Sequence, residues 1–373
     1  MLSIAKILTR QDNARPFSGE TAAGFIQKIQ RSIFYIKLTN WEYWPFYISN
    51  IPLVLTWAFF ALRARKAFFF SAVNPAIETG GMWGESKFNI LRRIPSSHVP
   101  VTVFVEKGTD FQQILDKMES AELRYPFIAK PNVGERGLLV SKIKNEEELS
   151  AYAAANQMDF LLQEFVDCPV ELAVMHHRFP GEARGKVTSI CIKETLKVTG
   201  DGIRPVRALM LENDRARLQL SRFEATAKPL LDKVPANGHT LELEPIGNHC
   251  RGTKFLNGNH FIDEKLTAEF DKVAAQMDGI HYGRFDLKCT SVEDLRAGKG
   301  FMVMEYNGIG AEPAHIYDPA YPIHQKFLEI FRHWRIIFRI YKIQRRKGET
   351  GMSIAEAVER LKTYIAYKKS LHT

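Results

Sequence analysis

The spacing of apolar and polar residues from Pro100 onward predicts a mixed α/β fold. Apolar residues alternate with polar ones, or run together between turn residues, in these expected strands: 101–108, 126–131, 137–143, 161–166, 170–179, 186–196, 282–289 and 301–307. Helical spacing indicates further elements at these segments: 88–93, 109–123, 145–158 and 263–279. Because the turn Pro180–Gly185 separates two expected strands, those strands should form a hairpin.

The first 95 residues differ in composition from the rest of the chain. The apolar run 66–75 predicts a short buried strand. The segment Trp44–Leu62 is aromatic and apolar, and the basic run Arg63–Lys66 follows it directly. A helix that spans a membrane needs roughly 20 predominantly apolar residues, and Asn50 and two prolines interrupt this segment. The segment is therefore expected to pack against the rest of the protein or to lie on a membrane interface, where aromatic rings and basic side chains are favourable.

The pattern predicts three domains. Residues 1–95 form an N-terminal lobe that rests on a membrane or binds substrate. Residues 96–320 form the α/β domain, whose first subdomain is 96–165 and whose second subdomain, 166–320, carries the metal site. The segment 321–373 predicts one or two C-terminal helices, over 324–348 and over 353–371, where Ser353 is a candidate N-cap.

Composition places the chain among ordinary globular proteins, because 373 residues with 45% hydrophobic and 25% charged residues can bury two or three cores. The formal charge of +9 favours an anionic partner, which could be a nucleotide, a nucleic acid or an acidic membrane surface. The cysteines are widely spaced, so we expect neither disulfides nor a zinc site, and a reduced, intracellular setting. The N-terminal residues lack the pattern of a signal peptide.

Polar side chains interrupt two apolar strands late in the α/β domain. A period of two predicts one shared face for Phe301, Val303, Glu305 and Asn307. The same period places Arg284 and Asp286 together on the preceding strand. If the two strands are neighbours, the oxygen atoms of Asp286, Glu305 and Asn307 converge as a ligand set suited to Mg²⁺. The alternative for each carboxylate is a solvated strand end.

Upstream residues have the chemistry to hold a nucleoside triphosphate. Lys130 can neutralise phosphate oxygens, and the glycines of the loop 132–137 allow backbone N–H groups to approach phosphates. The strand 161–166 is expected to offer a free edge to adenine, and Glu171 could accept both ribose hydroxyls. Taken singly, an edge lysine and an ordinary turn are equally good interpretations.

Together, in this order, these residues resemble the ATP-grasp superfamily over roughly Glu85–Pro319. The resemblance implies an α/β ATP-grasp fold in which two subdomains grip ATP, here with an atypical aromatic-rich N-terminal lobe and a helical C-terminal tail. It implies ATP and Mg²⁺ as cofactors, with Mn²⁺ as an alternative ion. It also implies an ATP-dependent carboxylate–amine ligase that forms an amide through an acyl phosphate and releases ADP and phosphate.

The resemblance also implies roles for single residues. The implied metal ligands are Asp286, Glu305 and Asn307. The implied catalytic residues are Arg284, Lys130 and Arg251, where Asn248 is the alternative to Arg251. The implied nucleotide-binding residues are Lys87, Lys130, Glu164, Phe165, Val166, Glu171, and either Lys193 or Lys197. The loop 132–137 lacks the serines of the D-alanine ligases, and the segment 307–315 departs from their pattern, so both argue against D-alanine as substrate.

Two rival classes remain. One is a non-catalytic, regulatory ATP-binding protein on a membrane surface, which the complete set of Arg, Asp, Glu and Asn side chains argues against. The other is a nucleic-acid binder, but the charges are dispersed and no motif of that class is present. The expected partners are a small carboxylate and a small amine, with peripheral membrane contact through the N-terminal lobe as an alternative. The expected location is the cytoplasm, with the inner face of the membrane as an alternative.

Overall fold

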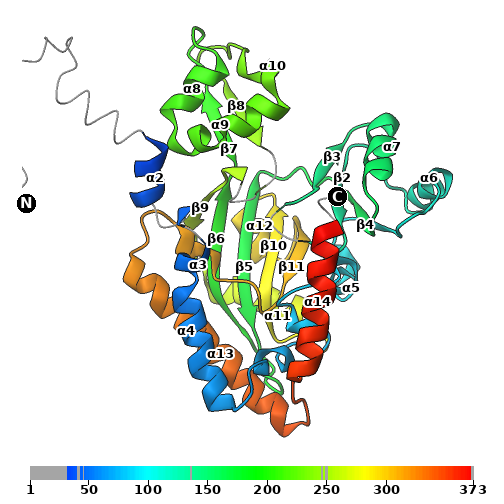
Figure 1. The fold of residues 1–373 in the computed structure, drawn as a ribbon, viewed down its shortest axis with the longest axis vertical. Coiled ribbons are helices and arrows are strands. Elements are labelled where there is room, and N and C mark those ends of the chain that lie inside the picture. Colours follow the sequence, from blue (N-terminus) through cyan, green and yellow to red (C-terminus); the bar gives the residue numbers. More distant parts are fainter. Residues whose placement is uncertain are drawn as a thin grey trace, which may run out of the picture. The chain divides into compact units, whose positions relative to one another are not determined.

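The computed structural model describes residues 32–39, 43–44, 46–134, 137–244, 247 and 251–370. The chain falls into two compact units, Met1–Trp44 and Pro45–Thr373. In the first unit, helix α2 spans Ile33–Thr39. All sheets formed by the described residues belong to the second unit (Figure 1).

The first large sheet is four-stranded and antiparallel, in the order β1-β4-β2-β3. Its strands are β1 (Thr102–Val105), β2 (Phe127–Pro131), β3 (Ser141–Ile143) and β4 (Phe160–Glu164). Helices α6 (Phe111–Ser120) and α7 (Glu146–Ala155) bury Ile114 and Leu149 in the same core as Phe127 of the sheet. The strands and helices predicted for this region are present, but the strand expected at 137–143 covers only Ser141–Ile143, because residues 137–139 form a turn.

The second large sheet is five-stranded and antiparallel, in the order β11-β10-β5-β6-β9. Its strands are β5 (Val170–His177), β6 (Lys186–Glu194), β9 (Lys254–Asn257), β10 (Tyr282–Cys289) and β11 (Phe301–Asn307). The helices that contribute to its core are α5 (Lys87–Leu91), α11 (Glu264–Ala275) and α12 (Val292–Arg296). Phe270 of α11 packs on Phe285 of β10, with ring centroids 5.3 Å apart. The predicted hairpin of β5 and β6 is confirmed.

Between β6 and β9 the chain forms a small insertion that the sequence pattern did not predict. It consists of β7 (Leu196–Thr199), α8 (Val206–Glu212), α9 (Asp214–Thr226), α10 (Lys228–Leu231) and β8 (Thr240–Glu244). The insertion buries a core of its own, in which Met210, Phe223 and Leu231 are at most 3% exposed. Short 3-10 helices occur elsewhere, at η2 (Phe69–Ala72), η3 (Glu78–Gly80), η4 (Ser96–His98), η6 (Asn259–Phe261) and η7 (Ala314–Tyr317).

The strand predicted at 66–75 is wrong, because its apolar residues form the 3-10 helix η2. All four residues of η2 are buried, and the rings of Phe69 and Phe70 each lie about 6 Å from Trp334. A short apolar run has no periodicity that separates a buried strand from a buried helical turn. Aromatic packing, rather than strand pairing, fixes this segment.

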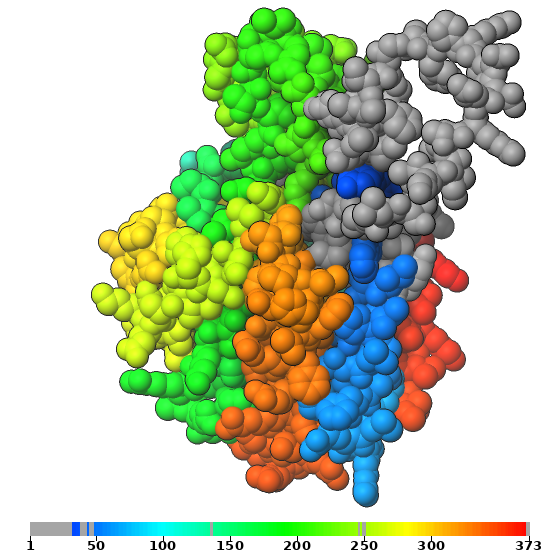
Figure 2. Space-filling model, turned by 90° about the vertical axis from the view of Figure 1, so that its left-hand side faces the viewer, coloured from blue at the N-terminus to red at the C-terminus, as the bar shows by residue number. Residues whose placement is uncertain are grey.

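The remaining helices of the described residues are α3 (Phe46–Ser49), α4 (Ile51–Ala64), α13 (Ile323–Arg346) and α14 (Ile354–Ser370). The two predicted C-terminal helices are thus present as α13 and α14. Helix α4 lies beside α13, where the ring of Phe60 is 5.4 Å from Phe331 and 5.1 Å from Phe338 (Figures 1 and 2). One face of α4 is therefore packed, while Leu55 and Leu62 are 65% and 80% exposed. Among the described residues, no helix is long and apolar enough to cross a membrane.

Candidate functional site

Strands β10 and β11 bring four polar side chains to the sheet face opposite the core. Arg284 pairs with Asn307, and Asp286 pairs with Glu305, across the antiparallel ladder. Phe285 and Tyr306, which alternate with these residues, point into the core. The two strands are therefore neighbours in the sheet, as the predicted ligand set requires.

The predicted single face for Phe301, Val303, Glu305 and Asn307 is wrong, because β11 contains a β-bulge. The register shifts between Asp286 and Leu287, so Leu287 pairs with Val303 and Met304 is the extra residue of β11. Phe301 and Val303 consequently lie in the core, and Glu305 and Asn307 lie on the open face. The bulge is what turns the two polar side chains away from the core.

Asp286 is the most heavily bonded group of the site. It is 6% exposed, and both of its carboxylate oxygens accept from Arg284, at 3.1 Å and 3.2 Å. The Nδ2 group of Asn307 donates to its Oδ2 at 2.9 Å. Burial alone would raise the pKa of Asp286, but the charges of Arg284 and Lys193 outweigh burial and hold this pKa below its ordinary value.

Of the two candidate lysines on β6 and β7, the structure brings Lys193 to this face. Its Nζ lies 3.2 Å from Oε1 of Glu171 and 3.4 Å from Oδ1 of Asp286. Burial acts to lower the pKa of Lys193, but Asp286 and Glu171 together raise it above the ordinary value. Lys197 is exposed on β7, where it pairs with Glu242 of β8.

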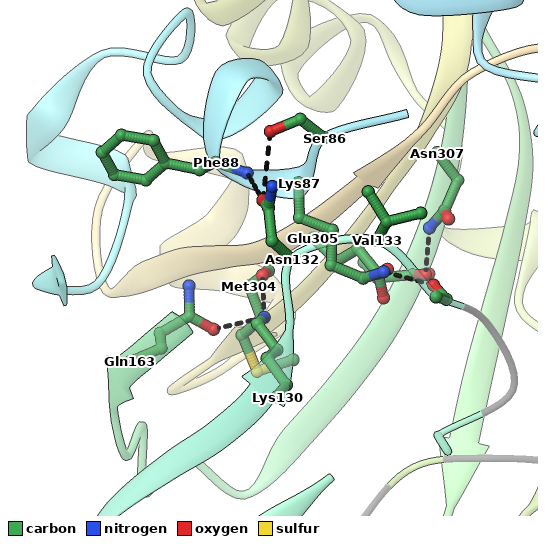
Figure 3. Close-up of polar contacts among 12 residues, drawn as sticks. Ser86, Lys87, Phe88, Lys130, Asn132, Val133, Gln163, Met304, Glu305 and Asn307 are labelled. Carbon is green, nitrogen blue, oxygen red and sulfur yellow. Dashed lines mark hydrogen bonds and ion pairs between the residues drawn. The ribbon is translucent and has the colours of Figure 1, made fainter. Parts of the chain in front are cut away.

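Lys130 reaches the site from the four-stranded sheet, as Figure 3 shows. Its Nζ donates to Oε1 of Gln163 at 2.8 Å and to the backbone carbonyl of Met304 at 3.0 Å. Burial lowers the pKa of Lys130 to about 8, although Glu305 and Asp286 act to raise it. Gln163 was not predicted. The only signal was a single amide side chain within the apolar run of β4.

Lys87 lies at the first position of α5, and Asn132 fixes that end of the helix. The backbone N–H of Phe88 donates to the Asn132 side chain at 3.1 Å (Figure 3). Lys87 Nζ lies 3.6 Å from Oε1 of Glu305 and donates to the backbone carbonyl of Gly134. Lys87 thus joins the loop after β2 to the proposed metal strand.

Two further side chains, Arg251 and Tyr367, tie the loop after β2 to other parts of the second unit. Arg251 Nη2 donates to the carbonyl of Gly137 at 2.8 Å and to that of Val140 at 3.4 Å. Tyr367 of α14 donates its hydroxyl to the carbonyl of Val133 at 2.8 Å. The central loop residues 135–136 lie outside the described residues.

Arg251 therefore contacts the predicted phosphate loop. Its Nη1 lies 3.6 Å from Glu244 of β8, so it also links the loop to the insertion. Its alternative, Asn248, lies outside the described residues. The catalytic role that the resemblance implies for Arg251 stays a prediction.

The strand that was expected to present a free edge, β4, lies between β1 and β2, so that prediction is wrong. The N–H of Glu164 donates to the carbonyl of Val101 at 2.8 Å, and its carboxylate accepts from Val101 N at 3.2 Å. The chain leaves the sheet at Phe165 and Val166, where Lys142 Nζ lies 3.4 Å from the centroid of the Phe165 ring. Adenine contact at 164–166 remains a prediction.

The segment after β11 also holds Arg284 in place. Arg284 Nη1 donates to the carbonyl of Glu312 at 3.1 Å, and the Tyr317 hydroxyl donates to the Glu312 carboxylate. Burial raises the pKa of Glu312, against the opposing effects of Tyr317 and Arg284. Neither Glu312 nor Tyr317 was predicted, although Glu312 lies in the segment 307–315 that departs from the D-alanine ligases.

Glycines allow the segment after β11 to contact the N-terminal part of the second unit. Ile309 N donates to Gly80 O at 3.1 Å, and Gly310 N donates to Gly81 O at 2.8 Å. A Cβ atom on Gly81, whose φ is +81°, would lie 2.7 Å from Cα of Gly308. The close approach of the two backbones therefore requires glycine at residue 81.

The chemistry of Asp286, Glu305 and Asn307 fits a hard divalent cation such as Mg²⁺ or Mn²⁺. Two carboxylates and one amide from paired strands supply oxygen ligands, which such ions prefer. Asn307 uses its Nδ2 group for Asp286, so its amide oxygen can bind a cation. Within the described ranges, no group of three or more His, Cys, Asp or Glu side chains could hold a metal. Water and phosphate oxygens would have to complete the coordination.

No family model matches the chain, and no curated protein matches it. Solved structures do match. VanG D-Ala:D-Ser ligase from Enterococcus faecalis matches at 14% identity and a TM-score of 0.40, covering 70% of this chain and 62% of that chain. D-alanine–D-alanine ligase from Bacillus anthracis matches at 14% identity and a TM-score of 0.40, covering 71% of this chain and 70% of that chain.

A bifunctional glutathione synthetase from Pasteurella multocida matches at 15% identity and a TM-score of 0.35, covering 66% of this chain and 35% of that chain. All three are ATP-grasp enzymes, the class that the sequence resembles. The chain spans less than two thirds of the VanG ligase. At 14–15% identity and TM-scores of 0.40 or lower, the likeness concerns the fold alone.

Proposed function

We propose that the chain is an ATP-dependent ligase that joins a carboxylate to an amine. The observation that carries this proposal is the convergence of Arg284, Asp286, Glu305 and Asn307 on one sheet face. Lys130 reaches the same strand from the other sheet, through its contact with Met304 O. Cationic side chains from one subdomain and oxygen ligands from the other suit a triphosphate with its metal ion.

The nucleotide would lie between the two sheets. Lys130 and Lys87 would contact phosphate oxygens, because both already donate to oxygen atoms beside β11 and the loop after β2. The carboxylate of Glu171, which Lys193 holds at 3.2 Å, would accept the ribose hydroxyls. Phe165 and Val166, just past the end of β4, would contact the adenine.

The reaction we propose has two steps. An oxygen of the acid attacks the γ-phosphorus, the bond from phosphorus to the ADP oxygen breaks, and an acyl phosphate forms. An amine then attacks the acyl carbon, phosphate leaves, and the amine loses a proton. Asp286, Glu305 and Asn307 would hold Mg²⁺, which supplies positive charge to phosphate oxygens.

Arg284 would face the charge that develops at the acyl group. Its guanidinium is held by Asp286 and by the carbonyl of Glu312, so its orientation is fixed before the reaction begins. Such transfers depend mainly on positioning and on neutralisation of charge. No nucleophile from the protein is required.

ADP release from ATP with a panel of acids and amines, with hydroxylamine present to trap an acyl phosphate, tests the proposal. ADP is expected to form with hydroxylamine and the correct acid before the amine is known. Glu305→Ala should lower turnover by about 100-fold or more, as the loss of one preorganised electrostatic contact commonly does. Glu293→Ala, which removes a carboxylate whose side chain is 80% exposed on α12, is the matched control and should keep wild-type turnover.

Two outcomes contradict the ligase. One is wild-type turnover by Glu305→Ala with the true substrates. The other is tight ATP binding without ADP formation across the whole panel, which would favour a regulatory nucleotide-binding protein.

A further inference from the structure

Helices α4 and α13 share an exposed apolar surface, which we name the α4/α13 face. Figure 2 shows the two helices next to each other, α4 in blue and α13 in orange. The large apolar residues of this face are Ile51, Val54, Leu55, Phe59 and Leu62 on α4, and Ile323, Phe327, Leu328 and Phe331 on α13. Their exposed fractions run from 40% for Phe331 to 80% for Leu62. A cluster of this size on two adjacent helices indicates an interaction site.

The two helices run in the same direction, so their corresponding ends meet. Phe59 lies 5.9 Å from Phe331, and one helical turn further on Arg63 lies 5.9 Å from Phe338. On α13 the apolar residues of the face occupy the first part of the helix, whereas on α4 they extend from Ile51 to Leu62, directly before Arg63. The exposed basic residues follow them: Arg63 and Arg65 at the end of α4, and Arg335, Arg339, Lys342, Arg345 and Arg346 on α13.

Acidic side chains are nearly absent from these helices. Helix α4 has none, and α13 has one, Glu329, which is 8% exposed and bonded to Arg332 at 2.9 Å. Arg339 is the member of the basic group with a carboxylate nearby, Glu182 at 3.6 Å. The face is therefore apolar at one end and strongly cationic at the other.

We infer that the α4/α13 face docks on the surface of an anionic lipid bilayer. A bilayer surface offers hydrocarbon and phosphate in one plane, which matches the two halves of the face. A second copy of the chain fits less well, because in either orientation the basic end would meet an apolar end or another basic end. The 14 residues of α4 are also fewer than the roughly 20 that a spanning helix needs, so the helix would lie in the interface.

Cosedimentation of the full chain with lipid vesicles tests this inference. One vesicle contains phosphatidylcholine alone, and the other contains phosphatidylcholine mixed with phosphatidylglycerol. The chain is expected to bind the mixed vesicles more tightly, and high salt should weaken that binding. Leu55→Glu combined with Leu328→Glu should weaken it by about tenfold or more, because both side chains leave the apolar layer. Ile203→Glu is the matched control, since Ile203 is 81% exposed on the insertion.

A second pair of variants isolates the charge. Arg335→Glu combined with Arg346→Glu should weaken binding to the mixed vesicles by about fivefold or more for each reversed charge. Lys107→Glu combined with Lys265→Glu is the control, because both lysines are exposed but lie outside the face. Thermal unfolding of each variant verifies that it is folded.

The inference is wrong if the wild-type chain binds neither vesicle, or if the Leu55 and Leu328 variant binds as tightly as wild type. The inference is also wrong if the wild-type chain does not bind vesicles but forms a dimer that the Leu55 and Leu328 variant does not form. The face would then join two copies of the chain. Vesicle binding is measured without ATP. The result therefore leaves the proposed ligase untouched.

Discussion

Two buried lysines, one from each large sheet, are held in opposite ways. Lys130 donates to two neutral acceptors, the Gln163 amide and the Met304 carbonyl. Lys193 lies between the carboxylates of Glu171 and Asp286. Burial lowers the pKa of Lys130 to about 8, whereas the carboxylates raise the pKa of Lys193 despite its burial.

This difference in bonding suggests different roles for the two lysines: one binds a ligand, and the other positions neighbouring side chains. A buried cation without a bonded counter-charge costs several kcal/mol, and it is tolerated where an anion is to bind. The charge of Lys193 is already neutralised inside the protein. We therefore expect Lys130 to contact phosphate, and Lys193 to position Glu171 and Asp286 for ribose and metal.

Removal of the two lysines should change the free energy of unfolding to different extents. Lys193→Met should lower it by about 3–5 kcal/mol, because the carboxylates of Glu171 and Asp286 lose a buried partner. Lys130→Met should change it by only about 1 kcal/mol, because the loss of two hydrogen bonds is offset by removal of a buried charge. Urea denaturation of both variants measures the two values.

Nucleotide binding supplies the second half of this test. Lys130→Met should weaken ATP binding by about 100-fold, as expected when one preorganised charge contact is lost. Binding can be measured by calorimetry on each folded variant. Equal destabilisation by both substitutions, or unchanged ATP binding by Lys130→Met, would remove the distinction between the two lysines.

The titration of Lys130 should appear in the pH dependence of both stability and ATP binding. The pKa of Lys130 is about 8 in the folded protein, against about 10.4 for an unfolded lysine. Between these pH values the unfolded chain binds more protons, so the free energy of unfolding should rise with pH across this window. ATP affinity should fall above pH 8, by up to about tenfold per pH unit, because Lys130 loses its charge while phosphate stays ionised.

Lys130→Met provides the control for both profiles, because methionine has no proton to lose. Stability and ATP affinity of this variant should lack the changes that begin near pH 8 in the wild-type protein. Identical profiles for the two proteins would assign the titration to another group.

A smaller effect should come from Arg251, which contacts the loop after β2. Arg251→Ala should raise KM for ATP by about tenfold and leave kcat nearly unchanged, because hydrogen bonds to the carbonyls of Gly137 and Val140 are lost. Arg207→Ala is a matched control on the insertion, where Arg207 pairs with Glu224. A fall in kcat at constant KM would instead assign Arg251 to the reaction centre.

Local pattern predicted most of the α/β domain, including β10 and β11 and the approach of Asp286 to Glu305. It missed the bulge, because Met304 is as apolar as the residues before it and an extra residue leaves no mark in composition. It also missed contacts that only folding creates. Lys130 meets Gln163 from 33 residues away and Met304 from 174 residues away. The period-two pattern of a single strand does not indicate which acceptor from a distant segment will contact a lysine.

The extra residue in β11 serves both large sheets at once. A bulged residue stands outside the regular ladder, so the Met304 carbonyl is available to Lys130. With Met304 as its extra residue, β11 thus keeps Glu305 on the open face and also contacts Lys130 of the other sheet. In a variant that lacks Met304, Glu305 would directly follow Val303 and would keep its place opposite Asp286 on the open face, but Lys130 would lose the carbonyl that it now contacts.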